Sequence, residues 1–330
     1  MYKGYNSILV TGATGFIGKY LCKILLENGW RVRGTFLSHK SSDALIPGVE
    51  AYATERLGPQ TDWSYPLKGI DVVIHLAARV HVMTETASDP MAAFRKANTA
   101  GTLCLANQAA KAGVKRFVFL STIGVNGADS GKTSYMESDV PHPHNFYSVS
   151  KHEAELALSK VSIQTGMDFT VIRAPIVYGP GNPGNFLNLL KILQKGIPLP
   201  FASIPNRRSL IYVGNLVDAL ALCAVHPAAA GKIYLLSDGE DISTSTLIMR
   251  TAEALRVKGR TFPLPADFMR FAGKLIGKSG AINQLLGSLV VDSSKIRNEL
   301  GWKPPFTMDE GLRMTAAWFR SSNSKIISGK

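Results

Sequence analysis

Strand-like and helix-like segments alternate along the first half of the chain, and this alternation constrains the fold more than any other feature. Apolar runs typical of buried strands occupy 7–12, 31–37, 49–53, 71–77, 115–122 and 169–174. Segments with the apolar periodicity of helices lie between them, at 15–29, 89–113 and 146–165. Because this pattern builds parallel strands joined by helices, the sequence predicts an α/β fold, with a doubly wound parallel sheet covered on both faces.

The pattern changes after "YGPG" at 178–181. Proline and glycine become frequent as far as Pro205. Helical patterns then appear near 215–226, 244–256, 292–300 and 308–320, with strand-like runs at 210–213 and 232–236. We therefore expect a first domain at 1–178 and a smaller, more helical lobe at 179–330, some of whose elements return to the first sheet.

The charge distribution restricts the class of partner. The 330 residues carry 37 Lys and Arg against 24 Asp and Glu, a net charge of +13. These basic residues are scattered, and aromatic residues do not interleave with them, which argues against nucleic-acid binding. An anionic small ligand, or contact with an anionic membrane surface, agrees equally well with the net charge.

The cysteines and the N-terminus bear on the compartment. Cys22, Cys104 and Cys223 are widely spaced and odd in number, which favours a reducing environment over disulfides, and no Cys/His cluster has metal-ligand spacing. The chain shows no signal-like segment and no apolar run near the ~20 residues of a membrane span. We expect a cytoplasmic protein without stable membrane insertion and without a metal.

Three glycines stand at the junction of the first strand and the first helix. Gly12, Gly15 and Gly18 follow "SILVT" directly and open an amphipathic helix. Glycines at such a junction allow a tight turn and close approach of the backbone to a pyrophosphate, which also meets the helix N-terminus. The first domain is therefore predicted to be a Rossmann-type dinucleotide-binding domain.

A tyrosine and a lysine, Tyr147 and Lys151, are four positions apart in "NFYSVSKHEAE". Residues with this spacing are neighbours on one face of any helix, so a structural explanation is open. A chemical explanation is open as well, because a nearby ammonium lowers the pKa of a phenol and makes it a usable proton donor or acceptor.

Several motifs occur together in a fixed order: "LVTGATGFIG", "DVVIHLAA", "FVFLST", "YSVSK" and "RAPIVYGPG". With these motifs the chain resembles the extended short-chain dehydrogenase/reductase family, and within it the nucleotide-sugar epimerases, dehydratases and 4-ketoreductases. The resemblance continues through "RRSLIYVGNLVDAL" and "DSSKIRNELGW", and so spans nearly the whole chain.

The resemblance implies roles for the catalytic groups. Tyr147 would be the acid/base, while Lys151 would bind the nicotinamide ribose and lower the phenol pKa. Thr122, at the end of the preceding strand, would hold the substrate oxygen, with Ser121 beside it lining the nicotinamide.

The resemblance also implies a dinucleotide site. Its residues would be Gly12, Gly15, Phe16, Ile17, Gly18, Leu57, Ala77, Ala78, Ser121, Tyr147, Lys151, Pro175 and Val177. The family usually has a carboxylate at the end of the second strand, where this chain has Phe36. Residues that could instead meet a 2′-phosphate are Arg33, Ser38, His39 and Lys40. This departure favours NADP(H), with NAD(H) as the other choice.

For the substrate, the resemblance implies a UDP-sugar. Asn185 and Arg208 would contact its diphosphate, and backbone atoms from Leu199 to Phe201 would grip the base. His81 would line the sugar pocket.

The same resemblance implies several reactions. The runs "HLAARVHVM" and "LGSLVVDSSKIRNELGW" look most like bacterial reductases of the C4 keto group of UDP-4-keto-6-deoxy-N-acetylhexosamines, which act in surface polysaccharide (O-antigen) synthesis. The alternatives are a UDP-hexose or UDP-N-acetylhexosamine 4-epimerase with bound NAD and, less favoured, a non-catalytic nucleotide sensor. The helices at 90–112 and 146–165 would form the four-helix bundle of a homodimer.

Overall fold

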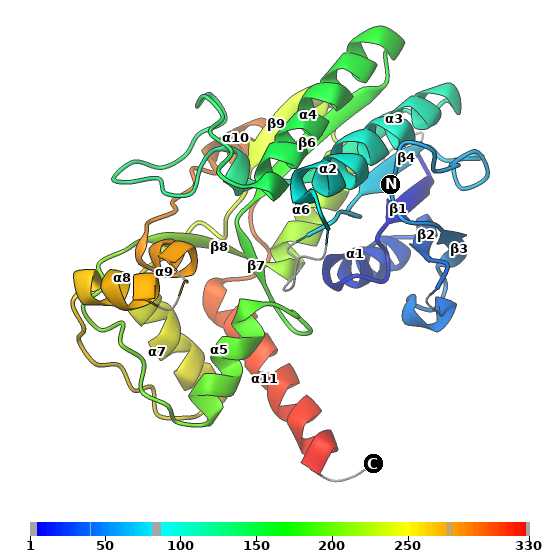
Figure 1. Ribbon diagram of the computed structural model, residues 1–330. Coiled ribbons are helices and arrows are strands. Elements are labelled where there is room, and N and C mark those ends of the chain that lie inside the picture. The colour runs from blue at the N-terminus through cyan, green and yellow to red at the C-terminus, as the bar shows by residue number, and fades with distance from the viewer. Residues whose placement is uncertain (1–4, 40, 81–86, 276, 278, 328–330) are drawn as a thin grey trace.

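Seven parallel strands form the central sheet of the computed structural model, which describes residues 5–39, 41–80, 87–275, 277 and 279–327 (Figure 1). Their order is β3-β2-β1-β4-β5-β6-β9. The bounds are β1 Ser7–Thr11, β2 Arg31–Leu37, β3 Glu50–Thr54, β4 Val72–His75, β5 Arg116–Thr122, β6 Asp168–Ala174 and β9 Lys232–Leu235. The strand order reverses between β1 and β4, the position at which such sheets bind ligands. The predicted α/β fold is confirmed.

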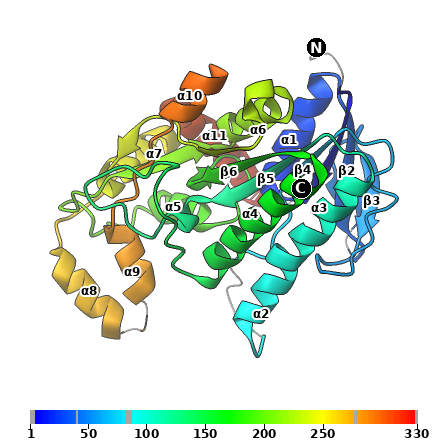
Figure 2. The same cartoon turned by 90° about the horizontal axis from the view of Figure 1, so that it is seen from above.

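Alternate residues of the strands feed two hydrophobic cores. On β1, Ile8 and Val10 face the layer of α1 (Phe16–Glu27) and α6 (Val213–Val225), whereas Leu9 faces α3 (Gly101–Lys111) and α4 (Phe146–Thr165). Figure 2 shows these two layers on opposite sides of the sheet. This is the expected consequence of the two-residue period of a strand that is buried on both faces.

The helix predicted at 89–113 is interrupted. α2 covers only Pro90–Phe94, and a π-helical segment, Arg95–Ala100, joins it to α3. The buried Asn98 lies in this segment. Such a local widening of a helix often occurs at functional sites, and here it contacts α4.

The second half of the chain contributes to both parts of the fold. Strand β9 belongs to the seven-stranded sheet and α6 to the helix layer that also contains α1. A small sheet has the order β10-β8-β7, with β7 Ile176–Tyr178, β8 Arg208–Tyr212 and β10 Asp241–Ile242. The helices are α5 Asn185–Gln194, α7 Thr244–Leu255, α8 Ala266–Leu275, α9 Ser279–Leu286, α10 Ser294–Leu300 and α11 Met308–Ile327. Helices α8 and α9 were not predicted from the sequence. The division at residue 178 stays a prediction.

Candidate functional site

The glycine turn has the shape that a dinucleotide needs. Gly12 has φ +70°, and a Cβ placed on it would lie 3.0 Å from the Ala77 nitrogen. A Cβ on Gly18 would lie 2.2 Å from the Gly12 oxygen, so α1 packs against the turn only with glycine there. No side chain caps α1, whose N-cap is Gly15. The N-terminus of α1 therefore offers backbone N–H groups to an anion beside the end of β1.

A buried network joins β1 to β4 directly beneath this turn. The Thr11 hydroxyl accepts the N–H groups of Leu76 and Ala77 and lies 2.6 Å from Nδ1 of His75. Nε2 of His75 lies 3.0 Å from the hydroxyl of Thr102 on α3. Burial lowers the pKa of His75 to about 3, with a further contribution from the charge of Lys151. His75 is thus a neutral structural bridge, a role that the sequence motif alone did not reveal.

Tyr147 and Lys151 occupy the first turns of α4, as the sequence predicted. Asn145 and Ser148 form a capping box that fixes where this helix begins. Lys151 is fully buried, and its Nζ lies 3.8 Å from the centroid of the Phe119 ring on β5. The Tyr147 ring meets Phe94 edge-on, at 6.4 Å between centroids. Both catalytic candidates are therefore held by aromatic contacts from neighbouring elements.

The protonation of Tyr147 and Lys151 differs from the expectation that a charged lysine lowers the pKa of the tyrosine. Burial raises the pKa of Tyr147 to about 12 and lowers the pKa of Lys151 to about 7, with Glu155 opposing the latter shift. The protein matrix by itself thus favours the neutral form of both groups. The lowered tyrosine pKa expected from the sequence is not produced by the chain alone, because burial raises the pKa of Tyr147.

Thr122 ends β5 close to the start of α4. Its hydroxyl oxygen accepts the Gly124 N–H at 3.1 Å, which leaves the hydroxyl hydrogen free to be donated. A Cβ built on Gly124 would lie 3.3 Å from Ser148 and 3.4 Å from the Thr122 oxygen, so this turn approaches the helix closely and a side chain there would require its neighbours to shift by a few tenths of an ångström. Thr122, Tyr147 and Lys151 are thereby brought to the carboxyl end of the sheet.

Beneath Thr122 lies a buried ion pair. Glu155 of α4 accepts two hydrogen bonds from Arg173 of β6, with Nη2 to Oε2 at 2.7 Å, and a third from Ser121. Burial opposes ionisation of Glu155, but these hydrogen bonds and the arginine charge hold its pKa below the usual value. The Ser121 hydroxyl thus joins β5 to this network, and its expected place beside the nicotinamide stays a prediction.

Asn98 connects three parts of the site. Its side chain bonds both backbone groups of Arg79, at 2.7 and 3.0 Å, and donates to the Ser150 hydroxyl at 3.0 Å. This holds the loop after β4, which contains Ala77 and Ala78, against α4. The amide satisfies buried backbone groups and organises the site at the same time.

Arg33, the third residue of β2, is bonded within the protein. Nη2 of Arg33 bonds both carboxylate oxygens of Glu50, at 2.9 and 3.0 Å, and Nη1 bonds the carbonyl oxygens of Tyr65, Pro66 and Lys68. The Arg33 guanidinium is therefore engaged within the sheet edge, and a role toward a 2′-phosphate stays a prediction. Ser38 and His39 are exposed at the end of the strand, and Lys40 lies outside the described residues.

The other cofactor candidates lie at the start of α1, beside the start of α3 and after the end of β6. Phe16 and Ile17 form the first turn of α1, and Leu57 packs beside Gly101 at the start of α3. Pro175 and Val177 follow β6 directly, and the Val177 oxygen accepts the amide of Asn182 at 2.6 Å. All of these residues are partly or fully buried.

The substrate candidates are spread over the second lobe. Asn185 is exposed at the first turn of α5. Arg208 is buried, and its Nη1 donates to the carbonyl oxygens of Gln284 and Gly287 at the end of α9. The backbone of Leu199 pairs with the segment 260–262, so its N–H and C=O are already engaged. His81 lies outside the described residues.

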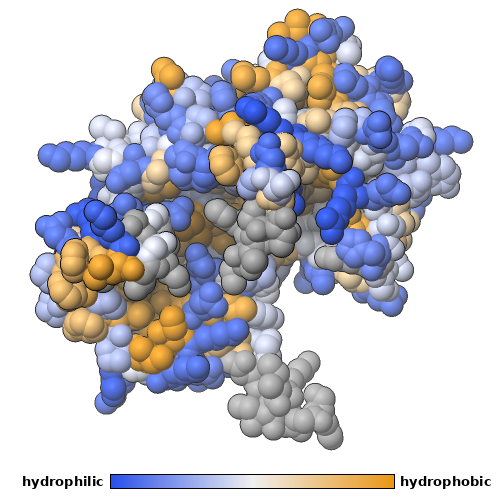
Figure 3. Space-filling model, in the orientation of Figure 1, coloured by the Kyte–Doolittle hydropathy of each residue, from blue (hydrophilic) through white to orange (hydrophobic). Residues whose placement is uncertain are grey.

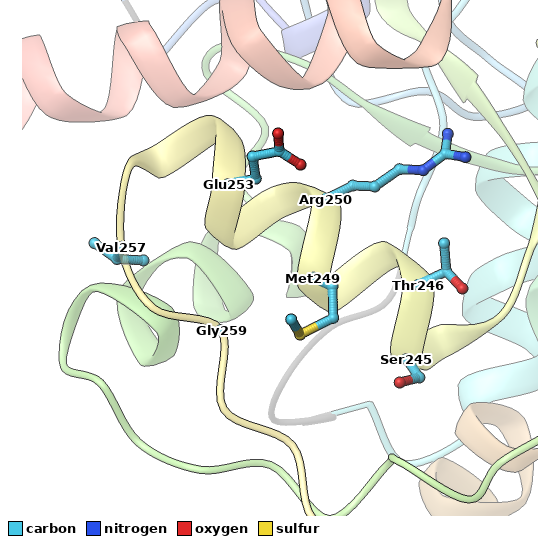
Figure 4. A pocket seen from close by; sticks show the side chains of 7 residues that line it. All are labelled: Ser245, Thr246, Met249, Arg250, Glu253, Val257 and Gly259. Carbon is cyan, nitrogen blue, oxygen red and sulfur yellow. The ribbon is translucent and has the colours of Figure 1, made fainter.

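A hollow of about 460 Å³ lies away from these residues, along α7 (Figure 4). It contains none of the catalytic candidates. Its arginine, Arg250, is already paired with Glu240 at 2.6 Å and lies 3.6 Å from Asp309. We therefore place the candidate active site at the carboxyl end of the parallel sheet, where Thr122, Tyr147 and Lys151 lie, and not in this hollow.

The described residues were also compared with the patterns of metal sites and of membrane-spanning helices. Among them, no group of three or more His, Cys, Asp or Glu side chains has the arrangement of a metal site. None of the helices in this part of the chain is both long enough and apolar enough to cross a membrane.

Comparison with known proteins agrees with this geometry. Residues 8–237 match the NAD dependent epimerase/dehydratase family. The chain is 41% identical to a UDP-glucose 4-epimerase of Vibrio cholerae, over 97% of both chains. It is 26% identical to an N-acetyl-α-D-glucosaminyl-diphospho-ditrans,octacis-undecaprenol 4-epimerase of Escherichia coli O157:H7, over 94% of both. The crystal structure of a Thermus thermophilus UDP-glucose 4-epimerase with NAD superimposes with a TM-score of 0.77 and 25% identity, covering 96% of this chain and 99% of that one.

Proposed function

The chain belongs to the NAD dependent epimerase/dehydratase family, and we propose that it is a UDP-hexose 4-epimerase that works with NAD. One observation carries the proposal: Tyr147 and the buried Lys151 share the first turns of α4, next to Thr122 and the glycine turn. The Vibrio relative, 41% identical over almost the full length, supports an epimerase over the reductase that the sequence motifs favoured.

In the proposed reaction, the chain's own residues handle the proton on the sugar oxygen. A bound NAD supplies a reversible acceptor for the hydride of the sugar carbon. Tyr147, as its phenolate, would take the proton of the C4 hydroxyl and, as the resulting phenol, would later return it, while Thr122 donates its free hydroxyl hydrogen to the same oxygen. Lys151, when protonated, would stabilise the phenolate form from which Tyr147 starts and to which it returns.

The glycine turn and its neighbours fit the dinucleotide. Gly12, Gly15 and Gly18 leave room for its pyrophosphate at the N-terminus of α1, and Ala77 and Ala78 line the switch point. With Arg33 occupied by Glu50, only Ser38 and His39 among the described candidates remain for a 2′-phosphate. This weakens the expectation of NADP and supports NAD.

A second candidate is the 4-ketoreductase acting on a UDP-4-keto-6-deoxy-N-acetylhexosamine. The observation in its favour is the end of β2, where Phe36, Leu37 and Ser38 provide no carboxylate for the ribose hydroxyls of NAD. A reductase exchanges its coenzyme in every turnover and so tolerates weaker binding there. The same catalytic residues would serve, with Tyr147 donating the proton. A non-catalytic sensor is least favoured, because Thr122, Tyr147 and Lys151 are all present.

We propose UDP as the nucleotide of the substrate, and we propose that Asn185 and Arg208 contact its diphosphate. Arg208 lies at the start of β8, where one nitrogen holds the end of α9. A guanidinium group is positively charged and presents its N–H donors in a planar fork, which makes it well suited to bind phosphate oxygens. A role in surface polysaccharide synthesis and a cytoplasmic location stay predictions.

One assay separates the candidates. Purified protein is incubated with UDP-glucose without added coenzyme, and separately with NADPH or NADH and UDP-4-keto-6-deoxy-N-acetylglucosamine. The epimerase produces UDP-galactose in the first mixture and leaves the reduced coenzyme unchanged in the second. A reductase shows the reverse, and a sensor shows no turnover in either.

A further inference from the structure

Helix α8 exposes an apolar stripe on the outside of the second lobe. Phe268, Phe271 and Leu275 are 58%, 59% and 72% exposed. Their spacing of three and then four residues puts them on one face of the helix. Such aromatic and aliphatic side chains normally face a core, so three of them on one exposed face indicate a surface that contacts something else.

The opposite side of α8 holds it to the protein. Met269 is buried in a small cluster with Ile204 and Leu286, against which Phe201 and Ile282 also pack. α8 and α9 pack against each other. The exposed stripe is therefore presented by an anchored helix, and it does not result from a helix that lacks a core.

A charged stripe borders the apolar one. Asp267, Arg270 and Lys274 are spaced by three and four residues and are exposed. Asp267 pairs with Arg270 at 3.0 Å, which leaves Lys274 as excess positive charge on this face. Across 258–280 the sequence holds five basic residues and one acidic residue. A helix with a basic side next to an exposed aromatic and aliphatic side has the pattern of helices that lie in the plane of an anionic bilayer surface.

The position of α8 fits such a contact. Figures 1 and 2 place α8 at the periphery of the molecule, far from the central sheet. In Figure 3, hydrophobic surface over α8 adjoins hydrophilic surface. Phe262, in the segment leading into the helix, is also 43% exposed. The net charge of +13 would attract the whole molecule to an anionic surface.

We propose that α8 docks the protein peripherally on an anionic phospholipid bilayer. Phe268, Phe271 and Leu275 enter the boundary between headgroups and acyl chains, and Lys274 extends along the helix flank to the lipid phosphates. The contact is reversible, because a single short helix buries little area. It is independent of the reaction at the end of the sheet.

The test is co-sedimentation of the full chain with phosphatidylcholine vesicles that contain or lack phosphatidylglycerol. We expect binding to the anionic vesicles, weaker binding at high salt, and little binding to neutral ones. The Phe268→Ser/Phe271→Ser double variant should have an affinity for anionic vesicles that is lower by a factor of about ten or more. Lys274→Gln should bind about fivefold less, as expected for one basic residue near the surface. Val140→Ser, which alters a residue that is 71% exposed outside α8, is the matched control and should bind like the wild type.

Three results would overturn the proposal. The first is that the wild type does not bind anionic vesicles. The second is that the double Phe variant binds them as well as the wild type. The third is that the double Phe variant changes the sedimentation mass, which would assign this face to a second copy of the chain. Far-ultraviolet circular dichroism and the thermal midpoint of each variant confirm that exposed substitutions have left the fold intact.

Discussion

The Nζ atom of Lys151 lies 3.8 Å from the centroid of the Phe119 ring, and the same ring stacks with His75 at 5.7 Å between centroids. Three side chains from α4, β5 and β4 thus form one buried column at the carboxyl end of the sheet. The lysine charge also contributes to the lowered pKa of His75. Lys151 on α4 is therefore coupled electrostatically to His75, the bridge beneath the glycine turn.

Removing only the phenol oxygen tests the acid/base role. Tyr147→Phe should lower turnover of UDP-glucose by a factor of about 10²–10⁴, because proton transfer in the transition state is lost. The ring contact with Phe94 remains, so the fold and NAD binding should be retained. Tyr65→Phe, at an exposed tyrosine stacked on Tyr52, is the matched control and should keep full activity. Unchanged activity of Tyr147→Phe would remove the tyrosine from the mechanism.

The close approach at the glycine turn can be tested with one methyl group. Gly18→Ala would put Cβ 2.2 Å from the Gly12 oxygen, so either the turn or α1 must move. We expect a loss of about 1–3 kcal/mol in the free energy of unfolding, together with weaker dinucleotide binding. Gly280→Ala adds the same methyl group in α9, where nothing lies within 4 Å, and should leave the stability unchanged or raise it slightly. Equal effects of the two variants in thermal melts would contradict this description.

The ion pair beneath Thr122 is expected to be structurally important. Glu155→Gln removes one partner of a pair with both side chains 4% exposed, and should cost about 3–5 kcal/mol. Glu153→Gln, two residues earlier on α4, breaks the more exposed pair with Arg95 and should cost about 1 kcal/mol or less. Denaturant unfolding measures both, and similar losses would mean that the buried pair does not hold β5, β6 and α4 together.

Much of this organisation is readable in the sequence, because the strands and helices of the first domain have the hydrophobic period of their class. The motif around Tyr147 and Lys151 is local, so its placement on α4 follows from helical spacing alone. The Arg33–Glu50 pair depends on which strand lies beside β2, and spacing does not encode this. The π-helical segment at Asn98 likewise depends on contacts with Arg79 and Ser150, since the residues of 95–100 have ordinary helical patterns.

Lys151 should make stability depend on pH above neutrality. Its pKa is about 7 in the folded chain and near the usual 10.5 in the unfolded chain, so between these values the unfolded state binds more protons. The free energy of unfolding should therefore rise with pH in this window, by up to about 1.4 kcal/mol per pH unit. The free energy of unfolding should be measured between pH 7 and 8.5 for the wild type and for Lys151→Met, and the variant should lack this rise. The same slope in both proteins would show that the lysine stays charged.

The homodimer can be tested on α4. Leu156 and Ile163 of this helix are 52% and 82% exposed, and Leu103 of α3 is 37% exposed. We expect these residues to pack in a four-helix bundle between two chains, so the wild type should sediment as a dimer. Leu156→Arg/Ile163→Arg should sediment as a monomer, because a charge in an apolar interface is costly. Lys160→Ala changes the same helix without adding a charge to that interface, and this control should stay dimeric.

The central claim is that Tyr147, Lys151 and Thr122 serve a UDP-hexose 4-epimerase. Its most direct measurement is proton NMR of UDP-glucose mixed with the purified protein and no added coenzyme, followed by mass spectrometry of the nucleotide released on denaturation. We predict that UDP-galactose appears until equilibrium is reached and that NAD is released. UDP-glucose that remains unchanged with NAD-loaded protein, while UDP-4-keto-6-deoxy-N-acetylglucosamine consumes NADPH, would contradict the account.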